Sequence, residues 1–288
     1  MKILFFFILL ISCNAQDPYD WVRSLPKPWT IDESTYDKIL PKFIKYFPDF
    51  DDRLKAINIW RIGTPYGIFK SGEEKEPDLD PILRIDTTDC TIHVLTSIAM
   101  NSSRSWGETK NKMIDIHYKP NEQNMKQAEY KNRWHYTSDR ILNNPYTVNI
   151  TNELALKNEL EEIELTLNEK SDGSEFLKLD WNMNGRFKFI RSEFVDDKLL
   201  EKLPPVCGIA FVKKAYVKNG ILIAHEGFVI DQKTLIHASS FSKKTIQEDL
   251  LNYLSGKKKI QEIYECDVVK LDNNNYKKIK IKDLYNIK

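Results

Sequence analysis

The sequence predicts an α+β domain in which a helical first half packs on an antiparallel sheet made by the second half. In the first half, Leu40, Phe43, Ile44 and Phe47 are spaced for one face of a helix. The second half instead contains short apolar runs rich in β-branched residues, such as 206–212. Helices followed by strands are typical of α+β domains.

The helical half can be divided by its capping and turn signals. Residues 17–27 contain prolines and are expected to form an extended arm, and the glycine- and proline-containing residues 62–67 a turn. Residues 71–80 are acidic and loop-like, and 118–146 have no clear period. Helices are expected over 33–47, 52–60, 90–100 and 106–116.

The second half is read mainly as strands. The alternating or β-branched runs lie at 163–167, 206–212, 221–230, 234–239 and 260–269. Between the last two runs, residues 242–254 predict a helix. The tail over 271–288 is rich in asparagine and lysine.

Length and composition limit the class of protein. The chain has 288 residues, of which 41% are hydrophobic and 30% charged, as in ordinary globular proteins. Its net charge is only +1, so no basic footprint indicates a nucleic-acid partner. We divide it into a signal peptide (1–15), an N-terminal arm and helices (16–60), a main domain (61–270) and the polar tail (271–288).

The N-terminus has the pattern of an export signal. Lys2 precedes an apolar run over 3–11 and then small residues, and this run is too short to span a membrane. Two processing routes fit. Leu10 to Cys13 resembles a lipobox, so the signal would cover 1–12 and a lipidated Cys13 would attach the protein to the outer membrane. The alternative is ordinary cleavage after Ala15. Both predict a secreted or periplasmic protein.

One cysteine stands where a nucleophile would be expected. Cys90 follows the polar residues 86–89, which are typical of a helix start. A helix N-terminus carries a partial positive charge that favours the thiolate, the nucleophilic form of cysteine. Cys207 and Cys266 either form a disulfide or, as we prefer, are two small buried residues.

Two histidines are expected to meet on a hairpin. His225 and His237 fall in adjacent strand-like segments, and an odd loop centred on Gln232 would place His225 opposite Ser239. His237 would then be a diagonal neighbour of His225 on the same face, within reach of its ring. His225 could act as base on Cys90 while His237 orients it, as in a catalytic triad. Strand alternation directs Glu226 to the other face.

These motifs, in this order, resemble a known family. Asp89-Cys90, His225 two residues before a glycine, and a following His237 are similar to the papain-like NlpC/P60 cell-wall hydrolases. More closely, the chain resembles the DUF1460 group, which is N-acetylmuramoyl-L-alanine amidase-like. The supporting segments are 63–67, 89–91, 133–140, 152–154, 208–212 and 235–239. The resemblance covers about 61–267.

The resemblance implies an enzyme and its substrate. It implies a papain-like fold and a cysteine amidase that cuts between N-acetylmuramic acid and L-alanine in peptidoglycan fragments, including anhydro-muropeptides. An endopeptidase that cuts between D-glutamate and the diamino acid is the alternative within the fold. A non-catalytic wall-binding lipoprotein is the alternative of another class. No cofactor is expected. No paired-cysteine zinc motif is present, and no metal is expected.

Four further residues are candidates for substrate contact. Tyr66 precedes the nucleophile and could offer its hydroxyl to the substrate, although structural tyrosines are commoner. Arg133, His135 and Tyr136 belong to a cluster of polar side chains. This cluster could read the peptide or sugar as one wall of a cleft, or it could be a solvated loop.

Overall fold

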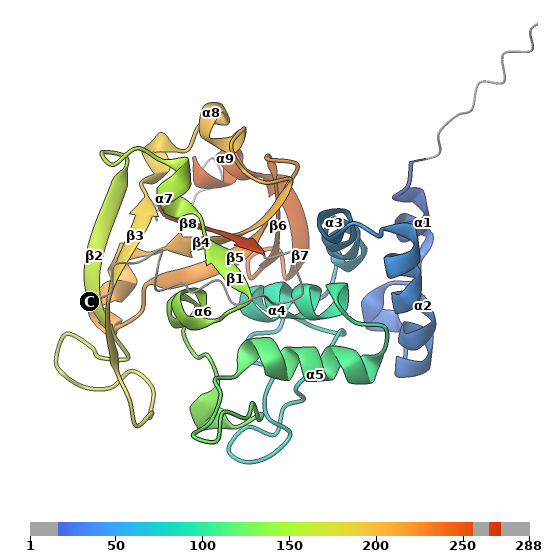
Figure 1. The fold of residues 1–288 in the computed structure, drawn as a ribbon, viewed down its shortest axis with the longest axis horizontal. Coiled ribbons are helices and arrows are strands. Elements are labelled where there is room, and N and C mark those ends of the chain that lie inside the picture. The colour runs from blue at the N-terminus through green and yellow to red at the C-terminus, as the bar shows by residue number, and fades with distance from the viewer. Residues whose placement is uncertain (1–16, 256–264, 272–288) are drawn as a thin grey trace, which may run out of the picture.

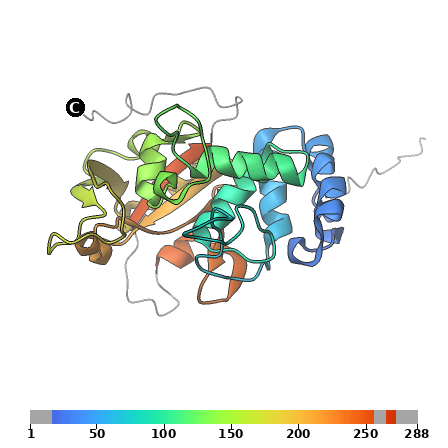
Figure 2. The ribbon, with the colours of Figure 1, turned by 90° about the horizontal axis from the view of Figure 1, so that it is seen from below.

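The computed structural model describes residues 17–255 together with the backbone of 265–271. Three N-terminal helices gather at one end of the molecule and a twisted sheet lies at the other (Figures 1 and 2). Helices α4 and α5 lie between these two parts. The signal segment, the lipidation candidate Cys13 and most of the polar tail are outside the described residues.

The N-terminal helices are α1 (Asp20–Ser24), α2 (Glu33–Tyr46) and α3 (Phe50–Arg61), with a 3-10 turn η1 (Pro28–Thr30) between the first two. α2 and α3 begin where aspartate side chains accept backbone N–H groups, as helix caps do. The predicted extended arm over 17–27 is wrong, because it contains α1. The Trp21 ring packs edge-on against Phe43, with ring centroids 5.0 Å apart, and this contact ties α1 to α2.

Helix α4 (Cys90–Asn101) begins at the predicted cysteine, and α5 (Trp106–His117) follows it. Three buried hydrogen bonds fix α4 on α3. The Arg61 guanidinium donates to the backbone oxygen of His93 and to Ser97 Oγ at 2.7 Å. The His93 ring also contacts Asn58 Oδ1 at 2.9 Å. The nucleophile candidate therefore begins a helix whose body is held in the core.

The sheet is antiparallel throughout, which confirms the predicted α+β class. Its strand order is β2-β3-β8-β4-β5-β6-β7, and β1 pairs with β8. The strands are β1 (Thr147–Asn149), β2 (Leu160–Leu167), β3 (Met183–Ile190), β4 (Val206–Val212), β5 (Ile223–Ile230), β6 (Thr234–Ser239), β7 (Lys244–Asp249) and β8 (Glu265–Leu271). Strands β4 to β7 form consecutive hairpins.

Short helices precede or connect the strands. They are α6 (Thr137–Asn143), α7 (Thr151–Leu154), α8 (Asp197–Leu200) and α9 (Leu250–Leu254), with 3-10 turns η2 (Tyr130–Asn132), η3 (Ser192–Phe194) and η4 (Lys214–Asn219). The helix predicted over 242–254 is wrong in its first half. There Lys244–Asp249 is strand β7, which pairs with β6, and only Leu250–Leu254 is helical.

Both faces of the central strands are covered. Phe228 and Ile236 pack into a cluster with Leu95 of α4, whereas the neighbouring Val229 and Leu235 pack with Leu250 of α9. Alternation along β5 and β6 therefore divides the core into two clusters on opposite sides of the sheet. Every residue of β4 is buried, as expected for a strand between two apolar layers.

Cys207 is free and buried, as we preferred. The pairing register places the Cα of Cys266 opposite Phe211, four residues along β4 from Cys207. Four residues of strand span about 13 Å, and a disulfide requires Cα atoms within about 7 Å. The strand register thus separates these two cysteines.

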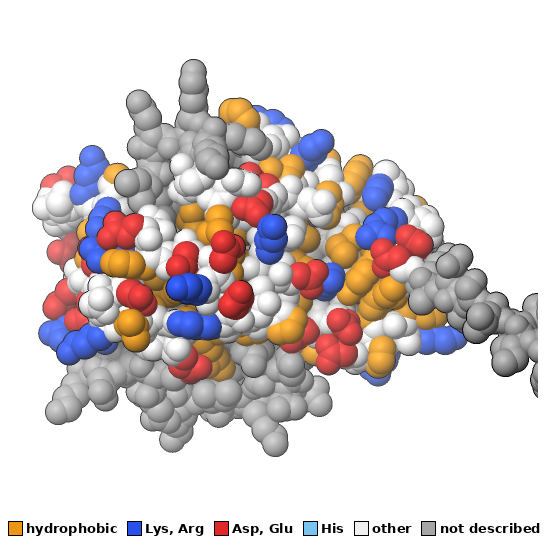
Figure 3. Space-filling view, turned by 90° about the horizontal axis from the view of Figure 1, so that it is seen from above, with side chains coloured by type: hydrophobic (Ala, Val, Ile, Leu, Met, Phe, Trp, Pro, Cys, Tyr) orange, Lys and Arg blue, Asp and Glu red, His pale blue; other side chains and the backbone are white. Residues whose placement is uncertain are grey.

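The surface shows no field of one sign on the face seen in Figure 3, where acidic and basic side chains are interspersed. Among the described residues, no helix has the length and apolarity that crossing a bilayer requires.

Candidate active site

Cys90 is positioned by its neighbour in sequence. Asp89 caps helix α4, because its Oδ1 accepts the N–H of Ile92 at 2.9 Å. Its Oδ2 accepts the N–H of Phe69 at 3.2 Å, which fastens the preceding loop to the helix start. The carboxylate therefore fixes both the first turn of α4 and the loop beside it.

Tyr66 is brought to the same place. Its N–H donates to the backbone oxygen of Lys243 at 3.0 Å, and its backbone forms a bridge with that of Thr88. Burial raises the pKa of the Tyr66 phenol to about 12, and the nearby Cys90 and Asp89 add to the rise. A neutral hydroxyl thus stands near the candidate nucleophile.

The sulfur of Cys90 lies against strand β5. The backbone N–H of Glu226 and the side chain of Thr91 are its hydrogen-bonding neighbours. Glu226 directly follows His225, so Cys90 meets β5 next to the candidate base. Within the described residues, no hydrogen bond joins the sulfur to the His225 ring. Catalytic pairs are often looser in structures without substrate.

The surroundings of Cys90 oppose the thiolate that a helix start favours. Burial raises the pKa of Cys90 to about 12, and the carboxylates of Asp89 and Glu226 raise it further. The positive end of α4 is already occupied, because Asp89 accepts its free N–H groups. Attack by Cys90 therefore requires a base that removes the thiol proton.

Alkylation of Cys90 by iodoacetamide is expected to accelerate about tenfold per pH unit up to pH 9, because the thiolate fraction grows in that way below a raised pKa. Cys90 should still react faster than Cys207, whose pKa is also about 12 by burial but whose side chain is fully buried. Peptide mapping of both cysteines between pH 5 and 9 measures this. A rate plateau over that range would show a preformed thiolate.

His225 and His237 meet as the hairpin register predicts. Phe228 pairs with Ile236 and Ile230 with Thr234, so the loop is centred on Gln232. Nε2 of His225 lies 2.6 Å from Nδ1 of His237, and the rings are edge to face. Both side chains are thus on the same face of the hairpin.

Gly227 allows this contact. It faces strand β6, where an added Cβ would lie 2.8 Å from the backbone oxygen of Ile236 and 2.9 Å from Cβ of His237. That approach is closer than real Cβ atoms make. The glycine two residues after His225 therefore leaves space for the second histidine.

The surroundings keep His225 neutral. Its ring stacks on Phe211, with centroids 5.6 Å apart, and lies near Tyr253 of α9. Burial lowers the pKa of His225 to about 3, and the neighbouring His237 lowers it further. An uncharged imidazole can accept a proton from a neutral thiol.

Glu248 contacts His237 and so joins the two histidines. Its role was not predicted from the sequence. Its Oε1 lies 2.9 Å from Nε2 of His237, opposite the nitrogen that meets His225. The mistaken helix over 242–254 hid it, because Glu248 reaches His237 only from a strand beside β6. The available signal was weak: the β-branched pair Thr245-Ile246 follows a turn.

Glu226 points away from the histidines, as strand alternation predicts. It is buried in an ion pair with Arg140 at 2.5 Å, and Thr137 donates to its other oxygen at 2.8 Å. Both partners are on α6. This pairing fastens α6 to the strand segment whose backbone contacts Cys90.

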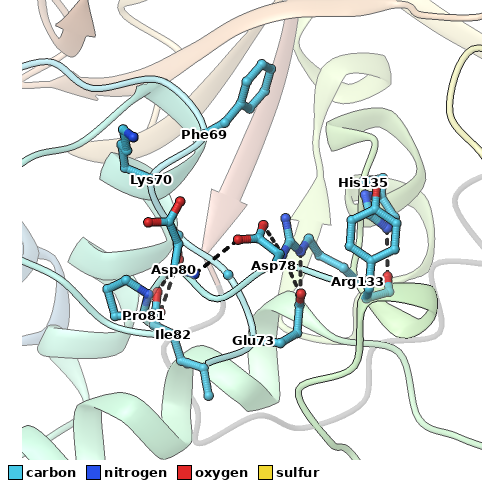
Figure 4. Close-up of polar contacts among 12 residues, drawn as sticks. Phe69, Lys70, Glu73, Asp78, Asp80, Pro81, Ile82, Arg133 and His135 are labelled. Atoms are coloured by element: carbon cyan, nitrogen blue, oxygen red, sulfur yellow. Dashed lines mark hydrogen bonds and ion pairs between the residues drawn. The ribbon is translucent and has the colours of Figure 1, made fainter. Parts of the chain in front are cut away.

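Arg133 and His135 belong to a separate set of polar contacts (Figure 4), and Tyr136 follows them in the sequence. Arg133 binds Glu73 and Asp78, with Nε to Glu73 Oε1 at 2.6 Å. In the described chain, none of the three predicted side chains shares a hydrogen bond or ion pair with Cys90, His225 or His237.

The polar groups of this second set are used inside the protein. His135 Nε2 contacts the backbone oxygen of Tyr130 at 2.7 Å, and burial lowers its pKa to about 4. The Tyr136 hydroxyl donates to Asn168 at 2.7 Å. Their contact with substrate stays a prediction, whereas Arg133 clearly holds the acidic loop over 71–80.

Replacing Arg133 by alanine should destabilise the protein by about 3–5 kcal/mol, because it leaves the buried Glu73 carboxylate uncompensated. Chemical denaturation measures the change. Arg186→Ala is the control, since its ion pair with Glu164 is exposed and should cost about 1 kcal/mol or less. Equal losses of stability in the two variants would show that Arg133 does not hold the acidic loop over 71–80.

Among the described residues, no cluster of three or more His, Cys, Asp or Glu side chains is arranged to hold a metal ion.

One known protein family matches most of this chain. A family model described as AmiA-like, N-acetylmuramoyl-L-alanine amidase-like, matches residues 58–260. A comparison with curated proteins found no match.

Several solved structures share the fold. A DUF1460 protein from Legionella pneumophila is 17% identical, with a TM-score of 0.67 over 83% of this chain and 94% of its own. An N-acetylmuramoyl-L-alanine amidase from Bacteroides uniformis is 17% identical, with a TM-score of 0.56 over 76% and 97%. A candidate xylanase from Bacteroides fragilis is 19% identical, with a TM-score of 0.58 over 75% and 99%.

The differing names show that this fold does not by itself fix a substrate. The family model, in contrast, spans most of the chain, from α3 to the region after α9. The chain therefore belongs to the N-acetylmuramoyl-L-alanine amidase-like (AmiA-like) family.

Proposed function

We propose that this protein is a papain-like cysteine amidase of the NlpC/P60 type that hydrolyses the amide between N-acetylmuramic acid and L-alanine in peptidoglycan fragments. The observation that carries the proposal is that the helix start bearing Cys90 meets β5 next to His225. There the sulfur of Cys90 lies beside the strand that bears His225, and His225 contacts His237.

The first half of the reaction forms an acyl-enzyme. His225 takes the proton of the Cys90 thiol while the sulfur attacks the amide carbonyl carbon. The base and the thiol both begin neutral, so proton transfer and attack proceed together. His225 then gives the proton to the nitrogen of L-alanine, the C–N bond breaks, and the sugar remains on Cys90 as a thioester.

The second half releases the sugar. His225 removes a proton from water, the resulting hydroxide attacks the thioester carbonyl, and the thiol is restored when the sulfur leaves with the proton. The products are a muramic acid carboxylate and a free peptide that begins with L-alanine. No cofactor takes part in these steps.

Negative charge on the carbonyl oxygen must be stabilised in both halves. The N–H of Cys90, the first of helix α4, has no hydrogen-bond acceptor among the described residues and is the donor we assign to this oxygen. The Tyr66 hydroxyl, which stays neutral, is the second candidate donor.

The same proposal covers where the enzyme works. An exported chain meets wall material, so we propose a periplasmic or secreted location, with anchoring through Cys13 as the lipoprotein route. Helices α1 and α2 lie at the end of the molecule away from the sheet (Figure 1), and α3 packs between them and the sheet, beside α4. We propose that this helical end favours small fragments, anhydro-muropeptides included, over polymeric wall.

Mass spectrometry of purified muropeptides after incubation with the enzyme tests the bond. The proposal expects intact sugar without amino acids and a free peptide that starts with L-alanine. Sugar that keeps L-alanine and D-glutamate would show the endopeptidase instead. Muropeptides left uncleaved but retained by the protein would show a wall-binding protein.

A further inference from the structure

The contacts of Glu248 bear on which nitrogen of His225 carries a proton. Glu248 approaches Nε2 of His237 at 2.9 Å, and Nδ1 of His237 approaches Nε2 of His225 at 2.6 Å. The three side chains come from β7, β6 and β5, which are consecutive in the sheet. They therefore form one hydrogen-bonded chain that crosses three strands.

The Glu248 carboxylate determines which atom donates and which accepts in each of these hydrogen bonds. An ionised carboxylate can only accept a hydrogen bond, so Nε2 of His237 must carry the proton toward Glu248. In a neutral imidazole the other nitrogen is then an acceptor, so Nδ1 of His237 must receive a proton from Nε2 of His225. By the same rule Nδ1 of His225 is left as a lone pair.

The order of donors and acceptors matters because these side chains are largely buried. The His237 side chain is 3% exposed and that of Glu248 19%. Water is largely excluded from the His237 contacts, so reversing one hydrogen bond would leave two donors or two acceptors facing each other. Such a mismatch is unfavourable in a buried site, because water cannot satisfy the unpaired groups.

We propose that Glu248 is a positioning residue that fixes the tautomers of His237 and His225 and so leaves Nδ1 of His225 as the atom that takes the Cys90 proton. The inference rests on the proposed cysteine mechanism for its catalytic consequence. Its structural content, the protonated nitrogen of each ring, does not depend on any substrate.

Nitrogen-15 NMR of the histidine rings tests this in the protein without substrate. In the wild type, both His225 and His237 should show a protonated Nε2 and an unprotonated Nδ1 at neutral pH. In Glu248→Gln, the His225 and His237 signals should shift toward a mixture of tautomers. The reason is that a glutamine amide can turn either its oxygen or its NH2 group toward His237.

Activity gives a second readout. Glu248→Gln should lower kcat by about 10- to 100-fold, the loss typical of carboxylates that orient a metal-bound imidazole, with a smaller change in KM. The matched control is Glu164→Gln, an exposed glutamate on β2 whose partner is Arg186. This control should keep the wild-type tautomers and kcat.

A protonated Nδ1 on His225 of the wild type would overturn the inference, and so would unchanged tautomers in Glu248→Gln. Loss of kcat without a tautomer change would likewise assign Glu248 a merely structural role. If the variant fails to fold, the wild-type spectrum decides alone. Absence of amidase activity in the wild type would refute the proposed function and leave the tautomer result standing.

Discussion

Replacement of Cys90 by alanine is expected to abolish turnover, with a loss of at least about 10⁴-fold in kcat/KM. In the proposed mechanism, the sulfur of Cys90 forms the covalent acyl-enzyme. The fold should survive, because the Asp89 cap and the buried face of α4 are untouched. Steady-state hydrolysis of a muropeptide, with circular dichroism as the test of folding, measures both effects.

Cys207→Ala is the matched control for this substitution. Cys207 is also a free cysteine, but it lies in the core cluster on the α9 side of the sheet. Its replacement should leave the activity per folded molecule unchanged. Wild-type turnover by Cys90→Ala would refute the whole mechanism.

Replacement of His225 by alanine should cost nearly as much as loss of Cys90. The thiol pKa of about 12 means that almost no thiolate exists at pH 7, so attack depends on the base. The double variant Cys90→Ala, His225→Ala should be no slower than Cys90→Ala alone, because members of a triad act as a unit. His237→Ala should lose less, since His237 orients the base and does not transfer the proton itself.

The measurement is single-turnover hydrolysis by each of these variants. If losses from Cys90→Ala and His225→Ala instead multiply in the double variant, the two residues act independently. His225 would then not be the base for Cys90.

The sequence predicted the parts of the site that depend on local signals. The Asp89 cap placed Cys90 at a helix start, and the odd loop around Gln232 placed the two histidines on one face. Both signals concern neighbours in sequence: a cap side chain binds N–H groups two or three residues away, and a tight turn sets the register of the strands it joins.

The sequence failed where long-range pairing decides structure. Residues Lys244–Asp249 have a mixed pattern, and their strand forms because the edge of β6 is available to pair. Strand β3 was missed too, although Phe187 and Phe189 alternate inward along it. The extended arm was wrong because residues 20–24 form α1, in which Val22 is buried and Trp21 packs against Phe43 of α2.

The state of the thiol could not be predicted for a similar reason. A helix start favours a thiolate in general, but the charges near Cys90 include Glu226, which is 136 positions away in the chain. Only the fold places that carboxylate, which is paired with the buried Arg140, near the sulfur. Arg133 likewise lies in a motif of the family, yet its partners Glu73 and Asp78 come from the acidic loop far before it.

The measurement that tests the account most directly is the mass of the adduct on Cys90 during turnover. Enzyme and a disaccharide or anhydro-muropeptide are mixed, quenched in acid within milliseconds to seconds, and digested for peptide mapping. The account predicts a thioester on the peptide that contains Cys90, with the added mass of the muramoyl sugar and no amino acid. Product formation without any adduct on Cys90 would contradict it, and an adduct that keeps L-alanine and D-glutamate would contradict the amidase bond.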